Sequence, residues 1–233
     1  MTKFSSKGLS VAWSEEYKRK GIPSSFRKAP TQALVEFIVW YQNKGLNPGN
    51  VVDIGCGQGR NSFYLANKGF NVTAIDLLSE NANFINNESQ RQKLPIQAFS
   101  QDVSTKWPVN KDSLDLAVDI FCYKHIVEKE DQKRYRTELW RTLKPNGYYF
   151  ISLASEKDGF YGSLLANSLD SNRKLIVDPY SKIPSLLYSL DELILEFSDL
   201  FCIVETKEEK STSPMYGKEY RRVILNCTFQ KRP

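Results

Sequence analysis

The sequence has few of the side chains from which metal sites and disulfide frameworks are built. It contains one histidine, His125, and four cysteines that lie far apart and form no Cys-x-x-Cys pair. Structural zinc sites and small disulfide-bonded folds both need such ligands or cysteines at close, regular spacing. We therefore expect neither a metal nor a disulfide framework.

Long apolar runs are also missing. No stretch approaches the roughly 20 apolar residues that a membrane-spanning helix needs. The first ten residues are polar and lack the hydrophobic core of a signal peptide. We therefore expect no membrane association and a cytoplasmic location.

No charge of one sign dominates the chain. Its 32 basic and 27 acidic residues leave a formal net charge of +5, and the basic ones are spread along the sequence. This pattern argues against a nucleic-acid partner. The composition is 41% hydrophobic and 25% charged, which is typical of a globular protein. We expect residues 1–233 to form a single α/β domain.

The stretch Val51–Gly59, Val-Val-Asp-Ile-Gly-Cys-Gly-Gln-Gly, predicts a buried strand followed by a glycine turn. Glycines at alternate positions let the backbone bend tightly and let a ligand approach it closely. The helix expected over 60–67 would present backbone N–H groups and the positive end of its dipole at the same place. The pattern indicates a site for a nucleotide-like ligand.

Strands and helices alternate after this turn. Five strands with helical crossovers predict a doubly wound, Rossmann-like, mostly parallel sheet. Two further strands, 201–206 and 222–229, follow without a helix between them and are joined by a charged segment, 207–218. The other expected strands are 51–54, 71–75, 96–99, 114–120 and 148–153, and the expected helices are 31–44, 60–67, 79–93, 129–143 and 190–197. The segment 144–147, Lys-Pro-Asn-Gly, is expected to form a turn.

Two segments lie outside this regular pattern. Residues 1–48 are expected to form an N-terminal helical flap or arm, with a short helix and then a loop in 11–30 and Thr31 as an N-cap. Residues 155–189 are rich in Gly, Ser, Asn, Asp and Pro and follow a strand directly. Because open α/β sheets bind ligands at the carboxyl ends of their strands, we expect 155–189 to be a substrate loop or lid.

Acidic residues fall near the ends of the first three strands, at Asp53, Asp76 and Asp102. Each alone is common in turns, but three in succession after a glycine turn indicate hydrogen-bond acceptors for a ligand. A nicotinamide site is the competing interpretation, since it also uses an acid after a glycine turn. The Gly-x-Gly-x-Gly spacing and the charge of Asp53 oppose a pyrophosphate and favour a cationic ligand such as S-adenosylmethionine.

These motifs resemble those of the class I S-adenosylmethionine-dependent methyltransferases over about 51–153. Within the first motif, residues 55–66 are similar to tellurite-resistance-type and thiopurine-type small-molecule methyltransferases. The resemblance implies a seven-stranded, mostly parallel sheet with an antiparallel last strand. It also implies methyl transfer with S-adenosyl-L-methionine as cofactor. The cofactor-binding residues that it implies are Asp53, Gly55, Cys56, Gly57, Arg60, Asp76, Leu77, Asp102, Val103, Asp119 and Ile120.

The acceptor is expected to be a small molecule with a thiol, amine, hydroxyl or carbon nucleophile. His125 follows the fourth strand near the expected acceptor position and is a candidate base, with a histidine that only supports the loop as the alternative. Candidate acceptor-binding aromatic residues are Trp13, Tyr17, Phe26, Tyr123 and Tyr161. A protein or RNA methyltransferase and a non-catalytic S-adenosylmethionine-binding module stay open, as does the choice between a monomer and a homodimer.

Overall fold

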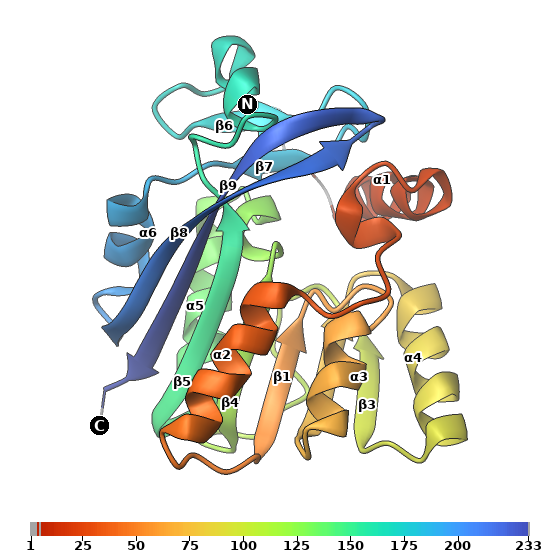
Figure 1. Ribbon diagram of the computed structural model, residues 1–233, viewed down its shortest axis with the longest axis vertical. Coiled ribbons are helices and arrows are strands. Elements are labelled where there is room, and N and C mark those ends of the chain that lie inside the picture. The colour runs from red at the N-terminus through yellow and green to blue at the C-terminus, as the bar shows by residue number, and fades with distance from the viewer. Residues whose placement is uncertain (1–3, 5, 233) are drawn as a thin grey trace.

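The fold is a seven-stranded sheet with the strand order β3-β2-β1-β4-β5-β9-β8, covered by helices on both faces (Figure 1). The computed structural model describes residues 4 and 6–232. The strands are β1 Asn50–Ile54, β2 Asn71–Asp76, β3 Ile96–Ser100, β4 Leu114–Ile120, β5 Leu143–Ala154, β8 Phe201–Met215 and β9 Lys218–Lys231, with β6 Leu175–Val177 and β7 Pro184–Leu186 in a second, two-stranded sheet. The α-helices are α1 Ser6–Arg19, α2 Gln32–Asn43, α3 Arg60–Asn67, α4 Ser79–Gln92, α5 Lys129–Thr142 and α6 Leu190–Phe197, and the 3-10 helices are η1 Pro23–Ser25, η2 Tyr123–His125 and η3 Gly162–Asn167.

The predicted fold class is confirmed. Strands β1 to β5 pair in parallel, whereas β9 runs antiparallel to both of its neighbours, β5 and β8. The strand order reverses beside β1, which lies between β2 and β4. Such a reversal opens a crevice at the carboxyl ends of the strands, where open α/β sheets bind ligands.

Each face of the sheet has its own apolar core. Helices α2, α3 and α4 cover one face through buried side chains such as Ile38, Leu65 and Ile85. Helices α5 and α6 cover the other face through side chains such as Leu139 and Phe197. Helix α2, which we expected to belong to an N-terminal flap, is thus part of the core, and only the chain before it forms an arm.

The crossover between β3 and β4 departs from the general pattern of helical crossovers, and none of the helices that we expected falls within it. Residues 101–113 contain no helix. Trp107 is 2% exposed, and its indole N–H donates to the Val103 carbonyl at 2.8 Å while its backbone N–H donates to Glu138 on α5 at 2.8 Å. One large aromatic side chain therefore fills the space beside α5 that a crossover helix would otherwise cover.

One predicted turn and most of one predicted connecting segment lie in strands. The charged segment 207–218 lies almost wholly within a long hairpin, because β8 continues to Met215 and β9 begins at Lys218. Residues 144–147 lie in β5, where a register shift opposite Asp115 accommodates Asn146 at φ +63°. Charged and turn-type side chains are compatible with both places, since β8 is an exposed edge strand and a bulge tolerates positive φ.

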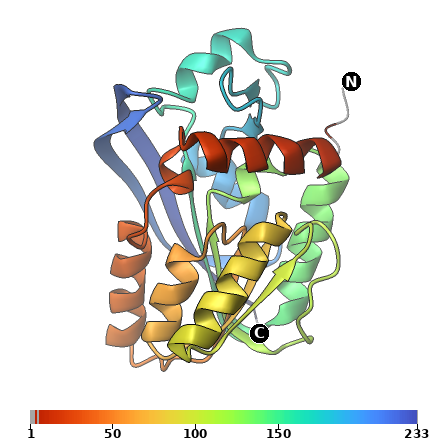
Figure 2. The ribbon, with the colours of Figure 1, turned by 90° about the vertical axis from the view of Figure 1, so that its right-hand side faces the viewer.

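Helix α1 lies across the carboxyl ends of the strands, as Figure 2 shows, and begins earlier than the short helix expected within 11–30. Residues 155–189 fold above the same edge of the sheet and contain η3 and the β6–β7 pair (Figure 1). Thr31 occupies the N-cap position of α2, but its side chain makes no capping hydrogen bond. None of the helices in 4 and 6–232 is long and apolar enough to cross a membrane.

Candidate active site

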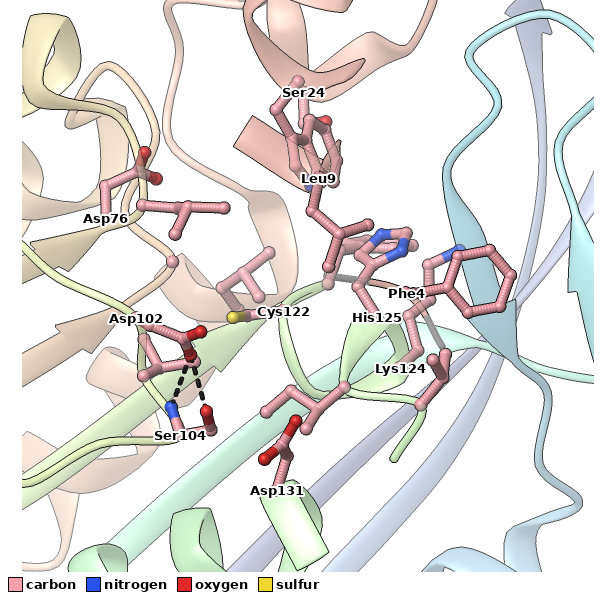
Figure 3. A pocket seen from close by; sticks show the side chains of 18 of the residues that line it. Phe4, Leu9, Ser24, Asp76, Asp102, Ser104, Cys122, Lys124, His125 and Asp131 are labelled. Atoms are coloured by element: carbon pink, nitrogen blue, oxygen red, sulfur yellow. Dashed lines mark hydrogen bonds between the residues drawn. The ribbon is translucent and has the colours of Figure 1, made fainter. Parts of the chain in front are cut away.

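A pocket opens at the carboxyl ends of the strands, under α1 (Figure 3). Asp76 and Asp102 lie at one end of it, Lys124 and His125 lie at the other, and Cys122 lies between them. The residues that line the pocket are Phe4, Leu9, Trp13, Tyr17, Ile22, Ser24, Gly55, Asp76, Leu77, Gln101, Asp102, Val103, Ser104, Ile120, Phe121, Cys122, Lys124, His125, Ile126, Val127, Glu128, Asp131 and Tyr161.

The glycine turn forms the floor at the end of β1. Gly55, Gly57 and Gly59 have φ values of +67°, +55° and +79°, in the left-handed region that side chains other than glycine rarely adopt. A Cβ atom at Gly55 would lie 2.6 Å from the Cβ atom of Cys122. The alternating glycines are therefore needed both for the bend and for the close approach of neighbouring atoms.

Asp76 ties the end of β2 to this turn. Its Oδ2 accepts from the backbone N–H of Gly57 at 2.8 Å, and its Oδ1 accepts from the backbone N–H of Leu78 at 2.9 Å and from Asn81 at 3.0 Å. Asp76 is 8% exposed and lines the pocket. Its carboxylate is thus held in a fixed position, with lone pairs left for ligand hydroxyl groups.

Asp102 follows β3 on the same side of the pocket. Its Oδ1 accepts from the backbone N–H of Ser104 at 2.9 Å and from the Ser104 hydroxyl at 2.7 Å, as the dashed lines in Figure 3 show. Leu77, Val103 and Ile120 supply apolar lining to the same pocket. These three residues and the two aspartates, which the sequence predicted to bind the cofactor, all line the pocket.

Asp53 and Asp119 lie beneath the pocket instead of lining it. Asp53 is 1% exposed and accepts from the Ser62 hydroxyl on α3 at 2.5 Å. Asp119 is fully buried and accepts from the backbone N–H of Cys122 at 2.9 Å and from the Tyr135 hydroxyl at 2.7 Å. These two carboxylates fasten α3 and the chain after β4 to the sheet and so position the residues that do face the ligand.

The stability of the fold is expected to fall as pH rises from about 4 to about 7. Burial raises the pKa of Asp119 to about 7 and that of Asp53 to about 6, from an ordinary aspartate value of 3.8. Across this window the folded protein keeps protons that the unfolded chain releases, so rising pH favours unfolding. Above it, Asp119 is ionised in both states, and its contribution to the free energy of unfolding no longer changes with pH. Urea unfolding at pH ~5 and ~8 measures this loss. Asp119→Asn should show a smaller loss than wild type, and an equal loss would contradict the assignment.

Helix α1 supplies two aromatic side chains to the pocket. The Trp13 ring packs edge-on against the His125 ring with 5.0 Å between centroids. The Tyr17 hydroxyl lies at the cofactor end, 2.2 Å from where a Cβ atom at Gly57 would stand. Burial, followed by the charge of Asp76, raises the pKa of Tyr17 well above its usual value, so the hydroxyl keeps its proton. Tyr17, which we expected near the acceptor, faces the glycine turn and Asp76 instead.

His125 lies in η2 at the other end. Its Nδ1 lies 2.8 Å from the Pro184 carbonyl oxygen, which fixes the proton on Nδ1 because a carbonyl can only accept. Burial, followed by the charge of Lys124, lowers the pKa of His125 well below its usual value. The ring is therefore neutral at pH 7.

Several predicted residues lie outside the pocket lining. Phe26 is 42% exposed, and Tyr123 is fully buried in the core, where its hydroxyl donates to Glu196 at 2.7 Å. Cys56, Gly57 and Arg60 also lie outside the lining. Tyr123 and Lys124 are neighbours in η2 and are both buried, but only Lys124 lines the pocket.

The main residue that the sequence reasoning missed is Lys124. It stands between the two residues we singled out, Tyr123 and His125, but a lysine in a loop is usually exposed. No metal-binding group of His, Cys, Asp or Glu side chains occurs in the described part of the chain.

The donor set of the pocket fits S-adenosylmethionine. Carboxylates at Asp76 and Asp102 can accept from ribose hydroxyls and from an adenine amino group, and the apolar lining of the same pocket suits a flat ring. The four carboxylates in and under this end favour a cation over a pyrophosphate. The cradle at Gly55 and Gly57 leaves no room for side chains where the ligand approaches the backbone.

Comparisons with known proteins point the same way. Residues 51–147 match the family model described as a methyltransferase domain. The chain is 27% identical to the putative methyltransferase YqeM of Bacillus subtilis, over 82% of this chain and 77% of that protein. It is 38% identical to the probable S-adenosyl-L-methionine-dependent methyltransferase TehB of Haemophilus influenzae, over 26% of this chain and 21% of TehB.

A solved structure shares the fold over the whole length. The 1,6-didemethyltoxoflavin-N1-methyltransferase of Burkholderia thailandensis, solved with 1,6-didemethyltoxoflavin and S-adenosylhomocysteine, superposes with a TM-score of 0.69 at 18% identity. The superposition covers 100% of this chain and 93% of that one. Fold, pocket chemistry and sequence relatives agree: residues 51–147 match a methyltransferase domain, and the chain is similar to S-adenosylmethionine-dependent methyltransferases such as TehB.

Proposed function

We propose that this enzyme methylates a small molecule bound in the pocket beside His125 and Lys124. The observation that carries the proposal is the pocket itself, which has a carboxylate-lined end and an aromatic end under α1. A pocket covered by a helix suits a ligand that is enclosed on most sides. A polypeptide or RNA acceptor would have to displace α1 to reach the same place.

The cofactor end is assigned to residues around the glycine turn. Asp76 would accept from the ribose hydroxyls, Asp102 and Val103 would meet the adenine edge, and Leu77 would pack on the ring. Gly55 and Ile120 would lie against the methionine portion, and Tyr17 would close this end from α1. Asp53, Cys56, Gly57, Arg60 and Asp119 are proposed to support the site from behind.

S-adenosylmethionine supplies a methyl carbon already activated by a sulfonium, so the protein has chiefly to align the acceptor and exclude water. Trp13 and Tyr161 would pack on the acceptor. We propose that neutral His125 orients it, because its lowered pKa makes the ring a weak proton acceptor. The Burkholderia enzyme, which was solved with a small acceptor and S-adenosylhomocysteine, supports an acceptor of this class.

The proposal is tested by following a labelled methyl group. Calorimetry first establishes that the full chain binds S-adenosylhomocysteine. The enzyme is then incubated with labelled S-adenosylmethionine and a cell extract, which is separated into small-molecule, protein and RNA fractions. We expect the label in the small-molecule fraction. Label only in protein or RNA would contradict the proposal, and binding without any transfer would favour a non-catalytic module.

A further inference from the structure

Lys124 is a buried amine that the assignments above leave unused. It is 0% exposed, lines the pocket, and its Nζ has no hydrogen-bond partner among residues 4 and 6–232. The Nζ atom lies 3.3 Å from the centroid of the Tyr161 ring. In Figure 3 Lys124 stands with His125 at the end of the pocket opposite Asp76.

The acids around Lys124 are committed to other donors. Asp158, which follows β5, accepts from the Arg222 side chain on β9 at 2.7 Å and from the backbone N–H of Tyr161 at 3.0 Å. Asp178, between β6 and β7, accepts from the Tyr216 hydroxyl at 2.8 Å and from the backbone N–H of Tyr180 at 2.8 Å. Two carboxylates thus lie near the Lys124 amine, but both are bonded to other donors.

The buried Glu16 of α1 is engaged in the same way. It accepts from the backbone N–H of Ile22 at 2.5 Å and from the Ser25 hydroxyl at 3.2 Å. The remaining charged neighbour, Arg222, repels a protonated lysine. The charged groups that act on Lys124 are therefore two acids already in use and one cation, beside a neutral histidine.

A ring contact cannot hold a buried ammonium by itself. A cation over an aromatic face is worth about 0.5–2 kcal/mol, whereas removing an ammonium from water costs several kcal/mol even after relaxation. Burial, opposed by the charges of Asp158 and Asp178 and reinforced by Arg222, lowers the pKa of Lys124 to about 7. A large fraction of the amine is therefore neutral at pH 7 and has a free lone pair.

We propose that Lys124 Nζ takes the proton from an acidic hydroxyl of the acceptor, of the phenol or enol type; this rests on the small-molecule function proposed above. The O–H bond breaks, its proton goes to the lysine lone pair, and the electron pair stays on the oxygen that receives the methyl group. The Lys124 ammonium that forms lies over the Tyr161 ring and pairs with the oxyanion of the acceptor.

Lys124 is better suited to this role than its neighbour. Burial and the charge of Lys124 lower the pKa of His125 well below its usual value, although the hydrogen bond to the Pro184 carbonyl opposes this, and the ring is the weaker proton acceptor. A base whose pKa lies near the working pH is the most effective one. The two side chains thus have different parts, with Lys124 accepting the proton and His125 orienting the acceptor.

The first test observes the lysine directly. The full chain with ¹³C-labelled lysine is titrated by NMR in complex with S-adenosylhomocysteine, and Lys124→Met identifies the resonance. Lys157→Met is the matched control, because that side chain is 63% exposed and pairs with Glu208 outside the pocket. We expect Lys124 to titrate about 3 units below the ordinary lysines. An ammonium that persists above pH ~9 would overturn the proposal.

The second test uses 4-nitrophenol, whose ionised form is yellow, as an acidic hydroxyl probe. Added to the same complex, it should ionise about one unit lower or more in wild type and Lys157→Met than in Lys124→Met. Calorimetry should show S-adenosylhomocysteine bound equally by all three. An equal ionisation midpoint in all three, or no binding of the phenol, would overturn the role of Lys124. A methyl label found only in protein or RNA would instead overturn the small-molecule function.

Discussion

Replacing Asp76 by alanine is expected to weaken the binding of S-adenosylhomocysteine by about 100-fold, measured by calorimetry. Two hydrogen bonds from ribose hydroxyls to a carboxylate are together worth roughly 3 kcal/mol or more. The same substitution releases the Gly57 backbone N–H and Asn81, which Asp76 holds at 2.8 and 3.0 Å. Both effects act on the cofactor end, so the loss should appear in affinity at any acceptor concentration.

Asp131→Ala is the matched control for this change. Asp131 is also a carboxylate that lines the pocket, but it comes from α5 and pairs with Arg134 (Figure 3). We expect its affinity for S-adenosylhomocysteine to stay within about twofold of wild type. Equal losses in the two variants would show that the carboxylates act only through the overall charge of the pocket. An unchanged affinity in Asp76→Ala would contradict the assignment of the ribose.

A second large effect is expected at the glycine turn. Gly57→Ala would place a Cβ atom 2.2 Å from the Tyr17 hydroxyl oxygen, at φ +55°. Overpacking of this kind costs roughly 1–3 kcal/mol, and a left-handed alanine about 1–2 kcal/mol more. Because α1 must move away to relieve the contact, we expect binding of S-adenosylhomocysteine to fall at least about tenfold.

The double variant Gly57→Ala with Tyr17→Phe separates the two causes. Without the hydroxyl, the nearest ring atom, Cζ, lies 3.4 Å from the new Cβ atom, an ordinary contact. We therefore expect the double variant to bind S-adenosylhomocysteine more tightly than Gly57→Ala, with only the backbone strain remaining. Gly217→Ala is the strain control, because Gly217 has φ +78° and open space around it. It should lower the unfolding midpoint without changing affinity, and the absence of any rescue would rule out the Tyr17 contact.

The parallel core of the fold could be predicted because its signals are local. Strands β1 to β4 are short, mainly apolar runs, of which β1 is followed by Gly55 and β2 ends at Asp76, and α6 begins with a Ser189–Glu192 capping box. The two last strands were also expected, at 201–206 and 222–229, but not their extension through 207–218 into one long hairpin. Its exposed edge strand carries charged side chains, and the hairpin is fixed to the sheet by the pairing of β9 with β5, which is distant in the sequence.

The two ends of the site also differ in how far the sequence predicts them. Asp76, Asp102 and Gly55 follow strands at fixed positions, so the sheet brings them together and the sequence pattern identifies them. The acceptor end is assembled by α1, η2 and the 155–189 segment, which meet only in the folded chain. Lys124 lines the pocket while Tyr123 lies in the core, although the two are neighbours in a single 3-10 turn. The residue types at positions 123 and 124 do not show which of the two side chains faces the pocket.

We propose that one pocket holds the cofactor at Asp76 and Asp102 and the acceptor at Lys124 and His125. A crystal structure of the full chain with S-adenosylhomocysteine would show where the cofactor lies. We predict the ribose at Asp76, the adenine beside Asp102 and Val103, and the sulfur directed toward the Lys124 end. Adenosine bound at the Lys124 end, or outside this pocket, would contradict the claim.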